Sequence, residues 1–272
     1  MTDDSLLASL PIWRGKPELT RLHEGRTNHN YIIRDDAGRY FGRAGIDLPH
    51  HGVFRANEKI CAELAAERGV APRVHYAQNG ILITEFIEGE TLKPPRMHDH
   101  AILRDIAALL RKLHAKPVTG VTLIPRCGIR VSLTYLEGLP DGDLPVARRK
   151  IIARMGPPSE GGDCLVHSDI IPENFMRAKD ALYLIDWEYG GSGVPEIDLA
   201  SVIANADLTP SENALLLEAY GPHDSDMVER QRVALVIREA MWCLTQMRHS
   251  GPSGDLVPYT ELCVARMMKE FA

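Results

Sequence analysis

The segment that most constrains the fold of this chain is residues 164–191, where two short apolar runs flank a polar turn. The runs, at residues 164–166 and 181–185, have the length and composition of short buried strands. If they pair as a hairpin, they bring the polar residues that follow each run to one end of the sheet. Those residues are Asp169, Asn174 and Asp186. We therefore expect these three side chains to lie close together.

The chemistry of these side chains fits magnesium-assisted phosphoryl transfer. Asp169 can accept a proton, while Asn174 and Asp186 can give oxygen atoms to Mg²⁺, which prefers few protein oxygens plus substrate phosphates. Each residue also has an ordinary structural interpretation, as a turn residue, a helix cap or the partner of a buried arginine. The presence of all three at this spacing favours the catalytic interpretation.

The amino-acid sequence of this segment resembles that of a known family. The motifs HSDIIPENF and IDWEY are similar to the catalytic loop and metal motif of the protein-kinase-like superfamily. They look most like the bacterial choline/ethanolamine kinases of the aminoglycoside phosphotransferase/choline kinase group. The resemblance covers most of the chain and implies an ATP- and Mg²⁺-dependent kinase. It implies that Asp169, Asn174 and Asp186 are catalytic and that Asn174 and Asp186 hold the metal. Asp198 matches a family aspartate that braces the catalytic loop.

The resemblance also implies the fold class, which is α+β and bilobal. We expect a small N-lobe with a five-stranded antiparallel sheet and one helix, and a larger, mainly helical C-lobe. The nucleotide-binding lobe would span residues 1–88, and the catalytic and acceptor-binding lobe residues 89–272. Within the second lobe, residues 117–158 read as irregular apart from a helix at 146–155.

The N-terminal half supplies the residues expected to contact ATP. The loop GRTN resembles the family's phosphate-covering loop, although alone it reads as an ordinary hairpin turn. Arg43 occupies the position of the phosphate-binding cation, and Glu58 is its natural partner, although Glu63 and Glu67 are equally available and Glu58 could be solvated. The backbone of the hinge after the fifth strand is expected to meet adenine. The predicted ATP-binding residues are Gly25, Thr27, Asn28, Arg43, Glu58, Glu85 and Ile87.

The acceptor pocket of this family uses aromatic faces and acids around a substrate ammonium. Tyr189, Trp242 and Tyr259 match aromatic positions of that pocket, whereas Glu239 replaces a family tryptophan. A carboxylate at that position favours an amine with N–H donors, such as ethanolamine. Helix packing would explain Trp242 and Tyr259 equally well. The predicted substrate-binding residues are Asp169, Glu188, Tyr189, Glu239, Trp242 and Tyr259.

Composition limits the class of partner. The net charge of −6 does not suggest a nucleic-acid partner. The five cysteines form no CxxC motif, which indicates reduced thiols in the cytoplasm and neither a disulfide framework nor a zinc site. No apolar run approaches the ~20 residues of a membrane span. We therefore expect a cytoplasmic monomer or homodimer whose partners are ATP and a small hydroxylated amine.

Other functions stay open at this point. The same chemistry could act on an aminoglycoside, thiamine or another hydroxylated molecule, although the late helices offer a polycation only the modest acidic set Asp224, Asp226 and Glu229. A non-catalytic nucleotide-binding pseudokinase is a different class, which the complete catalytic set disfavours. A metal hydrolase is a third, but His167 has no second histidine at ligand spacing.

Overall fold

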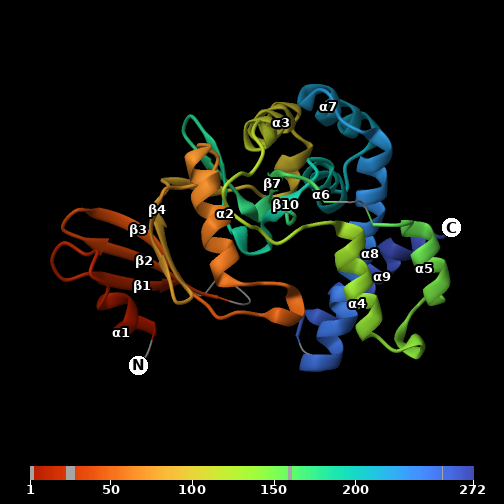
Figure 1. Ribbon diagram of the computed structural model, residues 1–272, viewed down its shortest axis with the longest axis horizontal. Helices are drawn as coiled ribbons and strands as arrows, with labels where there is room; N and C mark the ends of the chain where they lie inside the picture. The colour runs from red at the N-terminus through yellow and green to blue at the C-terminus, as the bar shows by residue number, and fades with distance from the viewer. Residues whose placement is uncertain (1–2, 23–27, 159–160, 253) are drawn as a thin grey trace.

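The computed structural model describes residues 3–22, 28–158, 161–252 and 254–272. It has the expected α+β architecture, with a five-stranded antiparallel sheet at one end and a mainly helical part at the other (Figure 1). Helix α2 (Arg55–Glu67) lies between the sheet and the helical part. The predicted fold class is therefore confirmed.

The N-terminal sheet has the strand order β1-β2-β3-β5-β4. Its outer face is covered by α1 (Asp3–Ala8), a short helix in addition to the one expected in this lobe. Leu7 of α1 packs with Tyr31, Ile33 and Ile83, which are all fully or almost fully buried. Because side chains alternate along a strand, these strand residues point toward α1 and the residues between them point toward α2. The strands are β1 (Glu18–Leu22), β2 (His29–Asp35), β3 (Gly38–Ala44), β4 (Val74–Gln78) and β5 (Ile81–Glu85).

The β4–β5 turn is attached to the backbone that follows β3. Asn79 and Gly80 both have positive φ, 52° and 78°, as a tight hairpin turn requires. The Gly45 N–H donates to the Gly80 carbonyl at 2.9 Å, and a Cβ on Gly80 would lie 2.1 Å from the Gly45 carbonyl oxygen. Only glycine permits this approach. It anchors the segment that leads from Arg43 into α2.

The C-terminal part contains seven α-helices and five short strands within the described residues. The helices are α3 (His100–His114), α4 (Gly128–Gly138), α5 (Arg148–Met155), α6 (Glu196–Ala206), α7 (Pro210–Tyr220), α8 (Ser225–Ser250) and α9 (Leu256–Lys269). The strands are β6 (Gly89–Thr91), β7 (Cys164–Val166), β8 (Phe175–Ala178), β9 (Leu182–Leu184) and β10 (Gly191–Gly193). The 3-10 helices of the chain are η1 (Pro49–His51), η2 (Pro94–His98), η3 (Asp141–Asp143), η4 (Pro172–Asn174) and η5 (Trp187–Tyr189).

Two local expectations were wrong. The strands at 164–166 and 182–184 exist but do not pair with each other, because β8 lies between them in the chain and pairs with β9. Strand β7 pairs instead with β10. Helix α4 lies in the region expected to be irregular; Gly128, Val131 and Thr134 are weak helix formers, and its packing on α8 overrides that preference.

The proposed lobe boundary between residues 88 and 89 stays a prediction. Strand β5 ends at Glu85 and β6 pairs with β8 of the C-terminal part, which is compatible with that boundary. Among the described residues, no helix combines the length and the apolar character needed to cross a membrane.

Candidate active site

The loop after β7 is held by a buried aspartate of α6. The backbone N–H groups of His167 and Ser168 both donate to the carboxylate of Asp198. The His167 nitrogen lies 2.9 Å from Oδ2, and the Ser168 nitrogen lies 2.7 Å from Oδ1. His114, at the end of α3, contacts the same carboxylate at 3.0 Å. Ser168 has φ of 65°, a left-handed conformation that costs energy for a non-glycine residue. The predicted bracing role of Asp198 is confirmed, and it holds a strained backbone next to Asp169.

The three residues predicted to be catalytic converge. The Asn174 side-chain amide donates to the Asp169 carbonyl at 2.9 Å, and the Ile185 N–H donates to the Asn174 carbonyl at 2.9 Å. Asp186 follows directly, with φ of 64° and a side chain that is 41% exposed. Because the nitrogen of Asn174 is used as a donor, its amide oxygen is the atom free to face a cation. An accessible carboxylate beside an amide oxygen is a donor set that fits Mg²⁺.

Arg43 connects the sheet to this loop. Its guanidinium group bonds Asp186 Oδ1 through Nη1 at 2.7 Å and contacts Glu58 Oε1 through Nη2. Arg43 is 5% exposed and Glu58 is 2% exposed, so the solvated interpretation of Glu58 is wrong. The predicted Arg43–Glu58 pair is therefore confirmed, and it lies against the candidate metal carboxylate.

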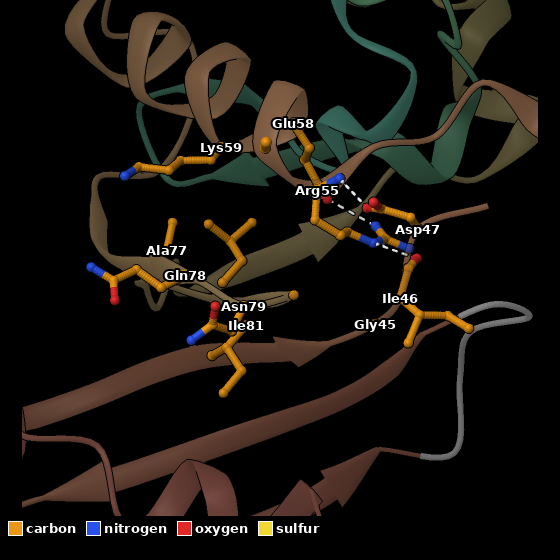
Figure 2. A pocket seen from close by; sticks show the side chains of 13 residues that line it. Gly45, Ile46, Asp47, Arg55, Glu58, Lys59, Ala77, Gln78, Asn79 and Ile81 are labelled. Carbon is orange, nitrogen blue, oxygen red and sulfur yellow. Dashed lines mark hydrogen bonds and ion pairs between the residues drawn. The ribbon is translucent and has the colours of Figure 1, made fainter. Parts of the chain in front are cut away.

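A second guanidinium group, that of Arg55, was not predicted. At the start of α2, it binds Glu58 Oε2 at 2.8 Å and Glu188 Oε2 at 3.1 Å, and it donates to Asn28 Oδ1 at 2.8 Å. The Asn28 amide in turn donates to Glu188 at 3.1 Å. Figure 2 shows Arg55 between α2 and the segment around Ile46, to whose carbonyl it donates at 2.9 Å. Its only sequence signal is its position three residues before Glu58.

The remaining predicted nucleotide residues are placed less completely. Gly25 and Thr27 lie outside the described residues. The Glu85 N–H donates to the Arg73 carbonyl at 2.8 Å, so this N–H is occupied, and Ile87 is half-buried in the segment after β5. The Arg39 guanidinium group lies over the neighbouring Phe86 ring, 4.0 Å from the ring centroid.

A cavity of about 590 Å³ lies between α2 and the β4–β5 turn. Figure 2 shows Lys59 on the α2 side of the cavity and Gln78 and Asn79 on the side of the β4–β5 turn, whereas Arg55 points toward the segment around Ile46. The described residues that line it include Glu58 but neither Asp169 nor Asp186. The cavity therefore lies beside the Arg55 network and is separate from the catalytic loop.

Asp169 has a cationic partner that was also not predicted. Arg238 of α8 donates to Asp169 Oδ1 at 3.1 Å and to the Ser168 carbonyl at 3.0 Å. Burial is the largest influence on Asp169 and raises the pKa of its carboxyl group above the ordinary value; Glu239 raises it further and Arg238 lowers it. A carboxylate with a raised pKa is a better proton acceptor.

The predicted acceptor residues fall into four separate places. Glu239 accepts a hydrogen bond from the Tyr259 hydroxyl at 2.8 Å and lies 3.7 Å from Arg238. The Glu188 carboxylate lies with Arg55 and Asn28 in the network at the start of α2. Tyr189 lies near Asp169; burial is the main cause of the raised pKa of its phenol, with added contributions from Tyr135 and Asp169.

Trp242 lies in a further group, centred on His51 of η1. The two ring centroids are 6.1 Å apart. His51 contacts the Tyr135 hydroxyl through Nδ1 at 2.9 Å and the Gln246 amide through Nε2 at 2.6 Å. Burial lowers the pKa of His51 to about 4, so the ring is neutral at pH 7. His51 and Tyr135 were not predicted, and neither stands in a recognisable motif.

Comparison with known proteins gives three findings. The model of the APH family, described as the phosphotransferase enzyme family, matches residues 18–235. The structure of a choline/ethanolamine kinase family protein from Mesorhizobium loti aligns with a TM-score of 0.76 at 24% identity and covers 98% of this chain and 92% of that chain. Among curated sequences, thiamine kinase of Escherichia coli is 25% identical over 204 residues, which is 70% of this chain and 67% of that protein.

A shorter match has higher identity. Protein LicA of Haemophilus influenzae is 43% identical over 54 residues. Those residues span 20% of this chain and 20% of LicA. This similarity is therefore local, whereas the structural similarity extends over the whole fold.

Proposed function

The chain belongs to the phosphotransferase enzyme family, and on that premise we propose that it transfers the γ-phosphoryl group of ATP, with Mg²⁺, to the hydroxyl group of a small amino alcohol such as choline or ethanolamine. The observation that carries this proposal is the contact of Arg43 with both Glu58 and Asp186. It brings the buried Arg43, which we propose as the phosphate-binding cation, beside a candidate metal carboxylate and close to the Asp169 loop.

Asp169 is the proposed proton acceptor. Its raised pKa makes the carboxylate a stronger base than an exposed aspartate, and Arg238 fixes the position of Oδ1. The hydroxyl group of the acceptor would lie against the carboxylate and lose its proton as the oxygen attacks phosphorus. A positioned base of this kind contributes about 10²–10⁴-fold to the rate.

Asn174 and Asp186 are the proposed metal-binding residues. A bound Mg²⁺ would neutralise charge on the phosphate oxygens during transfer. Arg43 would add its own charge to the same phosphates, and Glu58 and Arg55 hold its guanidinium group in place. Asn28, through Arg55 and Glu188, links the end of the proposed phosphate-covering loop to this network.

The choice of a cationic acceptor rests on one carboxylate and three aromatic rings of the C-terminal part. Glu239 supplies negative charge, and Tyr189, Trp242 and Tyr259 supply aromatic faces that can attract an ammonium group. Arg238 lies 3.7 Å from Glu239, so an acceptor ammonium would compete with it for this carboxylate. An amine that donates N–H bonds competes better than a quaternary one, which favours ethanolamine over choline.

Thiamine is the second candidate. The thiamine kinase match covers 70% of this chain, whereas the LicA match covers 20%. Thiamine is also a cation with a primary hydroxyl group, so the same catalytic residues would serve it. An aminoglycoside stays a third possibility.

The decisive experiment measures ADP formation by the purified protein with ATP, Mg²⁺ and one acceptor at a time, namely ethanolamine, choline, thiamine and an aminoglycoside. Phosphorus NMR of the products would identify the phosphorylated hydroxyl group. We expect acceptor-dependent ADP formation that is strongest with an amino alcohol and lost in Asp169→Asn. Binding of ATP without turnover on any alcohol would instead support the pseudokinase alternative.

We also propose a cytoplasmic location and a monomeric or homodimeric state. All five cysteines are free thiols, which fits the reducing environment expected from their spacing. Light scattering of the purified chain would give the oligomeric state.

A further inference from the structure

A compact group of metal-binding side chains lies between α8 and α9, apart from the proposed Mg²⁺ residues. Glu239 and Cys243 are four residues apart and therefore share one face of α8. Cys263 of α9 faces them. One carboxylate oxygen and the two thiol sulfurs all lie within 4.8 Å of one another.

The surroundings of this group suit a bound cation. Cys243 and Cys263 are 0% and 2% exposed, whereas the Glu239 side chain is 25% exposed, so an ion could enter from the acceptor side. The Tyr259 hydroxyl, one turn before Cys263, donates to Glu239 at 2.8 Å and places a fourth possible ligand atom beside the group. The two sulfur atoms lie close enough together for one ion to contact both of them.

We propose that Glu239, Cys243 and Cys263 form a binding site for one thiophilic divalent cation of the Zn²⁺ class. Two thiolates and one carboxylate, with water or Tyr259 in the fourth position, make a ligand set that Zn²⁺ accepts and that Mg²⁺ does not favour. Binding forms two sulfur–metal bonds and releases two thiol protons to solvent, so the affinity must rise with pH. The spacing of the cysteines in the sequence gives no sign of this site, because the second cysteine comes from a different helix.

A cation bound at this site would affect the catalytic loop through one intermediate residue, Arg238. Glu239 lies 3.7 Å from Arg238, which holds Asp169 Oδ1 at 3.1 Å. A cation bound to Glu239 withdraws its negative charge from Arg238 and from an acceptor ammonium. Micromolar Zn²⁺ should therefore inhibit turnover by raising KM for a cationic acceptor more than KM for ATP.

The direct test is titration of the full-length, reduced protein with Co²⁺, which reports thiolate ligation by a charge-transfer absorption band. We expect a band that saturates at one Co²⁺ per chain and disappears when Zn²⁺ is added. Cys243→Ser and Cys263→Ser should each remove most of it. Cys164→Ser, which changes a half-buried thiol on β7, and Asp186→Ala, which changes the proposed Mg²⁺ site, should both keep it.

Glu239→Gln guards against a cysteine variant that does not fold. It keeps the shape of the side chain but removes a metal ligand. Loss of a residue that only supports a ligand already weakens metal affinity by about tenfold or more, so Co²⁺ binding should weaken by at least about tenfold. Absence of the band in the folded wild-type protein overturns the proposal, as does a band that survives in both cysteine variants. Rapid loss of two thiols to a disulfide under mild oxidation, with no Co²⁺ band in the reduced protein, would assign the pair to redox chemistry and also overturn it.

Discussion

The proposed nucleotide and acceptor sides of the candidate active site are built in different ways. On the nucleotide side, the guanidinium groups of Arg43 and Arg55 bridge three carboxylates that come from α2 and from the segment after β9. On the acceptor side, one guanidinium group, that of Arg238, holds Asp169, and the aromatic residues lie in separate groups on α4, α8, α9 and η5.

The proposed function gives a reason for this difference. A triphosphate and its metal would present the same charges in every turnover, so a largely buried ion network would suit them. Acceptors differ in size and charge, and helix faces can change one residue at a time without disturbing the strand register. We therefore expect substitutions on the nucleotide side to act on catalysis and stability together, and substitutions on the acceptor side to act on KM and on pH dependence.

The largest expected effect is that of Asp169→Asn, at the junction of the two sides. Asparagine keeps the size of the side chain but cannot accept the proton, so kcat should fall by about 10²–10⁴-fold. Binding of a fluorescent ATP analogue should be largely unchanged, because the proposed metal ligands are intact. Asp180→Asn, in the exposed β8–β9 turn, is the matched control and should keep wild-type turnover. Retention of more than about a tenth of kcat would remove Asp169 as the base.

Arg55→Ala should produce the largest change in stability. It leaves Glu58 and Glu188, whose side chains are 3% and 8% exposed, without a shared cation. Breaking a buried pair in this way costs about 3–5 kcal/mol of unfolding free energy. Chemical denaturation would measure the loss, and Arg104→Ala, an exposed arginine of α3, should change stability by less than about 0.5 kcal/mol. Equal losses in the two variants would mean that the Arg55 network contributes nothing special.

The same contrast explains which parts could be predicted from the sequence. The strands of the N-terminal sheet follow from short-range patterns, whereas the Asp169 loop and the Arg43–Glu58 pair were predicted with the help of the resemblance of their motifs to a known family. Arg55 could not be assigned, because Asn28 and Glu188, the residues that give it a role, lie 27 and 133 positions away. Arg238 was missed for a similar reason. A charged residue on a mostly apolar helix reads as a surface residue until the helix is docked against the catalytic loop.

Trp242→Ala tests whether the His51 group belongs to the acceptor pocket. A desolvated cation–π contact contributes up to about 2 kcal/mol. At ~1.4 kcal/mol per factor of ten, KM for the amine should rise about thirtyfold while KM for ATP changes little. Trp242→Phe keeps a ring face and should recover much of the loss. If both variants only lower the melting temperature, Trp242 is a packing residue and the pocket ends at Tyr189 and Glu239.

The smallest expected effect is a displacement of the pH profile, and its direction separates two neighbouring residues of α8. Asp169 must be deprotonated to act as a base, so kcat/KM should fall on the acid side as pH drops through its raised pKa. Glu239 raises that pKa and Arg238 lowers it. The acid limb should therefore move to lower pH in Glu239→Gln and to higher pH in Arg238→Gln. Arg238→Lys keeps the charge and should leave the limb closer to its wild-type position.

These profiles would be recorded with saturating ATP and Mg²⁺, so that only the acceptor step limits the rate. If the acid limb moves in the same direction in Glu239→Gln and in Arg238→Gln, the variants act through the fold. Displacements in opposite directions would identify Arg238 and Glu239 as the pair that sets the basicity of Asp169.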